Sequence, residues 1–258
     1  MLYGICNLSI VPLRSTTSDI SEMVNQVLFG ETFEVVEKEK EWSKIRLTFD
    51  NSEGFIDNKQ YTNITENFFS KLKSKKQYFS GEIIDFVTND KNELTTIPLG
   101  SNLPFYNNCK LQITPEKNYC YEGIVLSEQK SKKEILQIAF TYLNTPFLWG
   151  GKTPFGIDCS GFTQMAYKLC GHHLLRDAKQ QATQGKVLSF IEESEPGDLA
   201  FFDNEEGEII HVGIILNDYH IIHCHGKVRI DTLDHSGIFN RDTQKHTHRL
   251  RIIKRLID

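Results

Sequence analysis

A change of pattern near residue 127 is the sequence feature that most constrains how this chain can fold. Before it, short segments such as 32–36 and 42–47 alternate apolar and polar residues, and turn-forming pairs separate them. After it, apolar residues recur at helical spacing and strand-like runs return only near the C-terminus. The 258 residues suffice for two or three small domains. The pattern therefore predicts an all-β first half and an α+β second half.

The first half has two weakly similar parts. Phe29-Gly30-Glu31 and Leu99-Gly100-Ser101 each precede an apolar pair, which suggests two copies of one small β unit, although chance similarity would give the same pattern. A short helix is expected around Ser18–Leu28. We expect domains at residues 1–62, 63–126 and 127–258, with the last boundary in a polar, charged stretch.

The second half begins with a predicted helix. Its apolar residues follow Ser131, an expected N-cap, and Glu134 gives the spacing of a capping box. A second helix is expected to begin near Cys159 and to end at Gly171. Three later runs predict strands of one antiparallel sheet, at 199–202, 212–216 and 219–223.

Composition excludes several classes of protein. The net charge of −5 gives no basic surface for nucleic acid, and the lysine run 71–76 is interpreted as a solvated face. The apolar runs are shorter than the roughly 18 residues of a membrane span. The N-terminus does not resemble a secretory signal, so a cytoplasmic location is expected. Six cysteines are too sparse for a disulfide framework and are expected to be free thiols.

Cys159 is the cysteine best placed for chemistry. It follows Gly156-Ile157-Asp158 and opens a predicted helix, where unpaired N–H groups and the helix dipole favour a thiolate. The alternative is a small core residue, which is how Cys170 is interpreted. Asp158 beside the thiol opposes ionisation, so its expected role is conformational or directed at substrate.

A nucleophilic cysteine needs a base, and histidine is the usual one. His211 opens an apolar run, where a polar residue is costly unless it is satisfied or used. His223 on the expected return strand could orient it. A three-residue loop, 217–219, would place His211 diagonal to His223 and directly opposite His225, so this spacing leaves both histidines open as the orienting residue.

The histidines also allow a metal interpretation. Zinc is the candidate for the run His220–His225 with His211 nearby, although His246-Thr247-His248 is a poor second pair. We expect no metal and no organic cofactor.

Five ordered motifs resemble those of the NlpC/P60 cysteine peptidases, which have a reduced papain-like fold. The resemblance covers about residues 130–258, and the first half is diffusely similar to bacterial SH3 (SH3b) domains. The order of domains resembles the γ-D-glutamyl-L-diamino acid endopeptidases of the dipeptidyl-peptidase VI type. The motifs are Phe147-Leu148-Trp149-Gly150-Gly151, Gly156-Ile157-Asp158-Cys159-Ser160-Gly161-Phe162, Arg176-Asp177, Pro196-Gly197-Asp198-Leu199-Ala200-Phe201-Phe202 and His211-Val212-Gly213-Ile214.

The resemblance implies a role for each matching residue. It makes Cys159 the nucleophile, His211 the base and His223 the orienting third residue. Asp177 would bind the free amino terminus of the substrate, or cap the following helix, or do both. Substrate contacts would also come from Trp149, Gly151, Asp158, Ser160, Phe147 and Glu22. Phe147 and Ala178 depart from the family, which often has tyrosine and a hydroxyl residue there, so side-chain hydrogen bonds are lost.

The resemblance implies an α+β peptidase domain after two small SH3b-like barrels. The expected reaction is cleavage of the γ-D-Glu to diamino acid bond in free murein peptides, which releases L-Ala-γ-D-Glu. The expected partner is therefore a peptide with a free N-terminal L-Ala, without nucleic acid or membrane, and the expected state is a monomer. The alternatives are an amidase or acyltransferase on the same Cys-His scaffold, and a non-catalytic SH3b peptide-binding protein.

Overall fold

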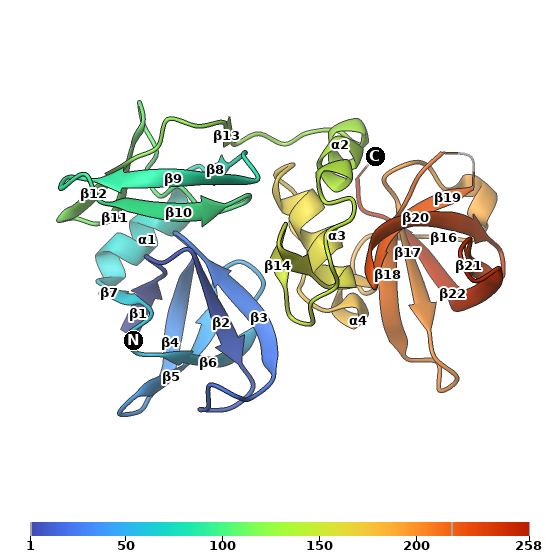
Figure 1. Cartoon of the computed structure of the whole chain (residues 1–258), viewed down its shortest axis with the longest axis horizontal. Helices are drawn as coiled ribbons and strands as arrows, with labels where there is room; N and C mark the ends of the chain where they lie inside the picture. The colour runs from blue at the N-terminus through green and yellow to red at the C-terminus, as the bar shows by residue number, and fades with distance from the viewer. Residues whose placement is uncertain (1, 218, 258) are drawn as a thin grey trace. The chain divides into compact units, whose positions relative to one another are not determined.

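The computed structural model describes residues 2–217 and 219–257. The chain forms two compact units (Figure 1). The first unit comprises Met1–Ser127 and Trp149–Thr153, and the second comprises Glu128–Leu148 and Pro154–Asp258.

The first unit begins with a seven-stranded antiparallel sheet of order β3-β2-β6-β5-β4-β1-β7. Side chains along β5 alternate between half-buried and buried, as the alternating sequence predicts. One apolar cluster, which includes Leu13, Phe33 and Ile45, fills the inner face of this sheet. The strands are β1 (Leu2–Ile5), β2 (Ile10–Arg14), β3 (Met23–Leu28), β4 (Thr32–Lys38), β5 (Trp42–Leu47), β6 (Glu53–Asp57) and β7 (Thr62–Ile64).

The helix expected around Ser18–Leu28 is wrong. Met23–Leu28 is the strand β3, which pairs with β2 from Ile10↔Leu28 to Arg14↔Met23. Val24, Val27 and Leu28 fit either period over so short a run, and pairing with β2 decides for the strand.

The expectation of an all-β first half is wrong, because a helix follows the first sheet. In α1 (Glu66–Ser74), Thr65 is the N-cap, and Phe68, Phe69 and Leu72 form the buried face. These side chains share an apolar cluster with Tyr3 of β1 and with residues of a four-stranded sheet of order β10-β9-β12-β11 (Figure 1). The remaining strands of this unit are β8 (Phe79–Ser80), β9 (Ile84–Asn89), β10 (Leu94–Pro98), β11 (Lys110–Thr114), β12 (Lys117–Cys120), β13 (Val125–Leu126) and β14 (Lys152–Thr153).

The second unit is a helical layer followed by a curled antiparallel sheet. β22 pairs with β17 and also with β21, so strands β17 to β22 close on themselves (Figure 1). The elements are α2 (Lys132–Thr141), β15 (Gly156–Ile157), α3 (Cys159–Lys168), α4 (Ala178–Gln181), β16 (Lys186–Leu188), the 3-10 helix η1 (Ile191–Glu193), β17 (Leu199–Asp203), β18 (Ile209–Ile215), β19 (His220–His225), β20 (Lys227–Asp234), β21 (Gly237–Asn240) and β22 (Lys245–Arg255).

The local predictions for this unit are confirmed. Ser131 and Glu134 form the capping box of α2. Helix α3 begins at Cys159, and Gly171 beyond its end has a positive φ of 76°, the left-handed backbone that glycine adopts without strain. Its apolar stripe, which includes Phe162 and Met165, is fully buried. The three predicted strands lie in β17, β18 and β19 of one antiparallel sheet.

Two simpler observations complete the fold. All six cysteines are free thiols, as expected. Within residues 2–217 and 219–257, no helix has the length and apolar character that crossing a membrane requires.

Candidate active site

Cys159 is the first residue of α3, the helix with the most buried face in the second unit. Asp158 is the N-cap, and its Oδ1 accepts a hydrogen bond from the N–H of Gly161 at 2.6 Å. The thiol lies within hydrogen-bonding reach of the backbone of Val212, the residue after His211. The fold therefore brings the start of α3 against β18 at the residues expected to react.

The thiol of Cys159 is protonated at neutral pH. Burial, and next the negative charge of Asp158, raise its pKa to about 12. This differs from the thiolate expected from the helix N-terminus alone, because desolvation outweighs the backbone dipoles here. A protonated thiol attacks a carbonyl only if a neighbouring base takes its proton, so the base is indispensable to any reaction at this residue.

The base candidate His211 contacts His223. Gly213 pairs with His223 and Ile215 with Ile221, so the connection is the three-residue loop that places His211 diagonal to His223; its middle residue, Asp218, lies outside the described residues. The Nε2 of His211 and the Nδ1 of His223 are 2.9 Å apart, and both rings are buried. Burial lowers the pKa of each histidine, so both are neutral at pH 7.

The register explains why the diagonal neighbour makes this contact. A Cβ on Gly213 would lie 2.8 Å from the Cβ of His223, so the absence of a side chain there lets His223 lean toward His211. His225 is exposed, and its ring centroid lies 6.4 Å from that of His223.

Sequence reasoning missed two charged residues behind His223. The Nε2 of His223 lies 3.1 Å from Oδ2 of Asp231, which is fully buried on β20. Arg229, paired with His223 across the strands, donates Nε to Oδ2 at 2.7 Å and Nη2 to Oδ1 at 2.9 Å of the same carboxylate. An acid two residues from an arginine in a strand was the available signal, but only the register of β19 with β20 shows which histidine they reach.

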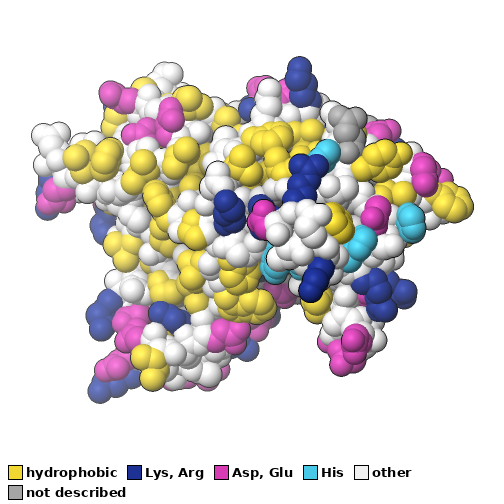
Figure 2. Space-filling model, turned by 45° about the vertical axis from the view of Figure 1, so that its right-hand side comes forward, with side chains coloured by type: hydrophobic (Ala, Val, Ile, Leu, Met, Phe, Trp, Pro, Cys, Tyr) yellow, Lys and Arg dark blue, Asp and Glu magenta, His cyan; other side chains and the backbone are white. Residues whose placement is uncertain are grey.

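His248 is a third ring of this cluster. It stacks on His211 with centroids 4.2 Å apart and an interplanar angle of 26°. Burial, and next His223, lower the pKa of His248 to about 4, so it is also neutral. Histidine side chains reach the surface at several points on one face (Figure 2). Across the described part of the chain, no group of three or more His, Cys, Asp or Glu is arranged to hold a metal ion.

Asp158 and Ser160 both contact a buried arginine. Arg176 donates Nη1 to Oδ1 of Asp158 at 2.9 Å and Nη2 to Oδ2 at 2.5 Å, and it donates Nη1 to the Ser160 hydroxyl at 3.1 Å. These contacts hold the turn that presents Cys159. The next residue, Asp177, is exposed and caps α4 in a capping box, in which Oε1 of Gln180 accepts from its N–H at 3.2 Å. Capping leaves its charge at the surface, so both roles expected of Asp177 are compatible.

The other predicted peptide contacts are divided between the two units. Phe147 is half-exposed and belongs to the second unit, where its N–H donates to the carbonyl of Gly226 at 2.9 Å. The exposed Trp149, the buried Gly151 and the exposed Glu22 belong to the first unit.

Within the first unit, a buried ion pair fixes the segment Trp149–Thr153. The Nζ of Lys152 lies 2.9 Å from Oε2 of Glu31, and the two side chains are 1% and 3% exposed. The backbone N–H of Lys152 donates to Oε1 of Gln26 at 2.8 Å. Gly150 has a φ of 73°, and a Cβ there would lie 2.4 Å from the carbonyl oxygen of Met23. This segment therefore packs tightly against β3.

Breaking the ion pair should destabilise the first unit strongly. We expect Lys152→Ala to lower its free energy of unfolding by about 3–5 kcal/mol, because Glu31 is left buried without its partner. Lys59→Ala, which removes the exposed pair with Asp57, is the matched control and should cost about 1 kcal/mol or less. Urea unfolding of both variants checks this; equal midpoints would contradict it.

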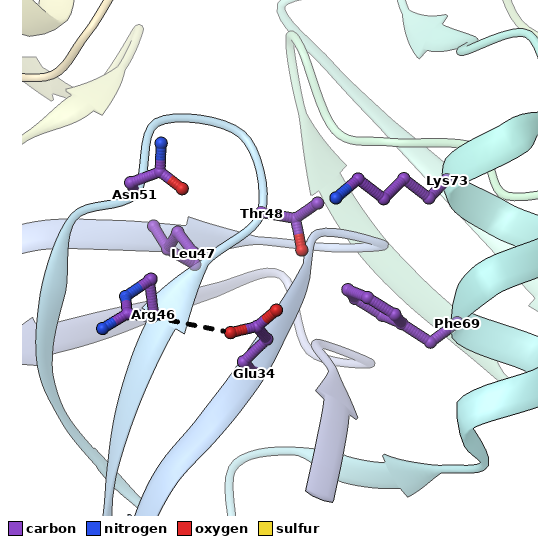
Figure 3. Close-up of a pocket in the computed structure, with 7 residues that line it drawn as sticks. All are labelled: Glu34, Arg46, Leu47, Thr48, Asn51, Phe69 and Lys73. Carbon is purple, nitrogen blue, oxygen red and sulfur yellow. Dashed lines mark ion pairs between the residues drawn. The ribbon is translucent and has the colours of Figure 1, made fainter. Parts of the chain in front are cut away.

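A pocket of about 140 Å³ in the first unit is a poor reaction site. Its lining includes Arg46, Glu34 and Lys73 but no cysteine or histidine (Figure 3). Arg46 is already paired with Glu34 at 3.7 Å and with Glu53 at 2.5 Å. The side chains suited to nucleophilic and acid–base chemistry lie around Cys159 and not in this pocket.

Comparison with known proteins identifies two family models that match parts of this chain. The model of the NlpC/P60 family matches residues 144–248, and that of the bacterial dipeptidyl-peptidase SH3 domain matches residues 13–60. The chain thus carries an NlpC/P60 domain preceded by a bacterial dipeptidyl-peptidase SH3 domain, and the resemblance found from the motifs is confirmed.

The chain is also similar to individual proteins over part or most of its length. The chain is 39% identical over 105 residues to the gamma-D-glutamyl-L-lysine dipeptidyl-peptidase of Bacillus subtilis (strain 168), covering 40% of this chain and 35% of that protein. It is 25% identical over 240 residues to dipeptidyl-peptidase 6 of Lysinibacillus sphaericus, covering 83% and 85%. The crystal structure of an NlpC/P60 family protein from Bacillus cereus ATCC 10987 is similar in fold, with a TM-score of 0.82 and 18% identity over 99% of this chain and all of that one.

Proposed function

We infer that the chain is a cysteine peptidase that cleaves the bond between γ-D-glutamate and a diamino acid in free murein peptides, releasing L-Ala-γ-D-Glu. The observation that carries the proposal is the position of His211. It contacts His223, and it lies on β18, the strand that the Cys159 thiol approaches at Val212. The names of the Bacillus subtilis and Lysinibacillus sphaericus relatives support the substrate class.

The reaction begins from a neutral thiol and a neutral imidazole. His211 takes the proton of Cys159 as Sγ attacks the γ-carbonyl carbon, and backbone N–H groups at the start of α3 stabilise the oxyanion. The C–N bond then breaks, and the imidazolium of His211 gives its proton to the leaving amine. The thioester is hydrolysed by a water molecule that His211 deprotonates, which restores the thiol and releases the dipeptide acid.

The domain layout is part of the proposal. Residues 1–62 and 63–126 are proposed as two SH3b-like units, although β7 (Thr62–Ile64) of the first sheet crosses that boundary. Residues 127–258 are proposed as a papain-like catalytic domain, apart from Trp149–Thr153, which belong to the first unit. The similar backbone of Gly30 and Gly100, with φ of 76° and 84°, supports two related β units. The protein would act as a cytoplasmic monomer in recycling cell-wall peptides, with no membrane or nucleic-acid partner.

Recognition of a free amino terminus would give the enzyme a preference for short peptides. Asp177 presents an exposed carboxylate at the start of α4, where it can pair with the ammonium group of an N-terminal L-Ala. Phe147 is proposed as a further contact to the peptide, while Asp158 and Ser160 act at the nucleophile turn. The contacts expected from Glu22, Trp149 and Gly151 of the first unit stay predictions.

Product analysis tests the assignment. The enzyme is incubated with L-Ala-γ-D-Glu-L-Lys, with the corresponding meso-diaminopimelate peptide and with intact sacculi, and products are followed by mass spectrometry. We expect L-Ala-γ-D-Glu from one or both free peptides and much slower release from sacculi. Cleavage of sacculi at a similar rate, or cleavage of neither peptide, would reject the assignment and favour an amidase, an acyltransferase or a binding module.

Asp177→Asn tests amine recognition separately from helix capping. Asparagine caps a helix as well as aspartate does, so the fold should be retained while the charge is lost. A charge-assisted hydrogen bond contributes about 1.5–3 kcal/mol, so kcat/KM for the free peptide should fall by roughly 10- to 100-fold. N-acetylation of the peptide should cause a similar loss in the wild type and little further loss in the variant; an undiminished effect of acetylation in the variant would contradict this role.

A further inference from the structure

We propose that Asp231, held by Arg229, is a positioning residue that fixes the tautomers of His223 and His211, so that His211 presents Nδ1 as its free acceptor. The proposal rests on the proposed function for its consequence in catalysis, but its structural content concerns only the second unit. The contacts that carry it are those behind His223.

The carboxylate of Asp231 accepts hydrogen bonds on both oxygens. Oδ2 receives the Nε of Arg229 and faces the Nε2 of His223, while Oδ1 receives the Nη2 of Arg229 and the backbone N–H of Arg241 at 3.1 Å. Burial alone would raise the pKa of Asp231, but the hydrogen bonds from His223, Arg229 and Arg241 hold it well below its usual range. The group is therefore an ionised, acceptor-only partner.

An ionised partner determines where the proton of His223 sits. Its Nε2 must carry hydrogen, because an unprotonated Nε2 would place a lone pair against the carboxylate at 3.1 Å. Since burial keeps His223 neutral, its Nδ1 is then unprotonated and can only accept. The 2.9 Å contact thus requires the Nε2 of His211 to donate to the Nδ1 of His223.

The tautomer of His223 in turn determines the tautomer of the base, His211. Neutral His211 has one proton, and Nε2 holds it, so Nδ1 carries the only lone pair in the plane of the ring that can take a proton from a thiol. The charged or titratable groups facing this pair are His248 from β22, His225 from β19 and the Asp231–Arg229 pair from β20. Among these, Asp231 alone brings negative charge into line with the ring that becomes positive during the reaction.

Nitrogen NMR tests the assignment without any substrate. In protein labelled with ¹⁵N-histidine, with resonances assigned by single His→Asn variants, long-range ¹H–¹⁵N correlations distinguish the Nε2–H from the Nδ1–H tautomer. We expect Nε2–H for both His211 and His223 in the wild type, and loss of that fixed tautomer at His223 in Asp231→Asn. An Nδ1–H tautomer of His223 in the wild type would overturn the proposal, whatever substrate the enzyme uses.

Kinetics of the same variant give a second readout. Removing a carboxylate that supports a functional histidine typically costs about 10- to 100-fold, and we expect that loss in kcat with KM little changed. The acid limb of the pH profile should also move to lower pH, because His211 loses a group that stabilises its protonated form. Asp234→Asn is the matched control. Asp234 lies on the same strand as Asp231, but it pairs with the exposed His246 instead of a buried histidine. Equal kcat and pH profiles in the two variants would reject a positioning role; Arg229→Gln provides an intermediate test if Asp231→Asn does not fold.

Discussion

Cys159→Ala should lower kcat for the free peptide by about 10⁴-fold or more while leaving the fold intact. The change removes the sulfur that forms the acyl bond, and the neighbouring Ser160 hydroxyl is buried and accepts a hydrogen bond from Arg176. Alanine favours helix and lacks only the sulfur atom of cysteine, so little stability should be lost. Peptide turnover and circular dichroism measured on the same preparations check the two halves of this expectation.

Cys170→Ala is the control for this prediction. Cys170 lies beyond the other end of α3, is buried and has its pKa raised to about 12 by burial, like Cys159. Its replacement should lower stability modestly and leave kcat unchanged. Equal turnover of the wild type and Cys159→Ala would remove Cys159 from the mechanism.

His211→Ala is expected to have the second-largest effect, a fall in kcat of roughly 10²- to 10⁴-fold. The reason lies in the protonation state of the thiol, whose pKa of about 12 leaves almost no thiolate at neutral pH. Without the base, residual activity depends on that small fraction. It should therefore rise about tenfold per pH unit between neutral and moderately alkaline pH, a dependence that the wild type lacks.

His225→Ala separates the role of His211 from a general effect of the histidine cluster. His225 is exposed, and its ring lies farther from His223 than that of His211 does. We expect kcat within a few fold of the wild type. A loss in His225→Ala comparable with that in His211→Ala would show that the orienting residue has been misassigned.

The fold was predictable where local signals were strong and unopposed. The capping box at Ser131 and the glycine after α3 define helix ends by hydrogen bonding within a few residues. Segment 23–28 has no such signal, and its strand conformation comes from pairing with β2. Helix α1 was missed because its apolar face is only three residues wide and lies beside a run of lysines.

The residues of the candidate site were likewise predictable only where a local sequence signal marked them. Cys159 stands out because it opens α3, and His211 because it is a polar residue directly before the apolar run 212–216. The register of β18 with β19 confirms the three-residue loop, which by itself left His223 and His225 both open, and the contact of His211 with His223 decides between them. Identifying Asp231 required two successive strand registers, that of β18 with β19 and that of β19 with β20. The effect of burial on the pKa of the Cys159 thiol follows from the packing of α3 against β18. Local sequence could reveal neither.

The most direct test of the account is to find the acyl group during turnover. Wild type mixed with excess L-Ala-γ-D-Glu-diamino acid peptide is quenched in acid within milliseconds to seconds, and its intact mass and proteolytic fragments are measured. The account predicts a fraction of protein heavier by one L-Ala-γ-D-Glu acyl group, located on the fragment that contains Cys159 and absent from Cys159→Ala. An acyl group on another residue, or product release by Cys159→Ala at the wild-type rate, would contradict it.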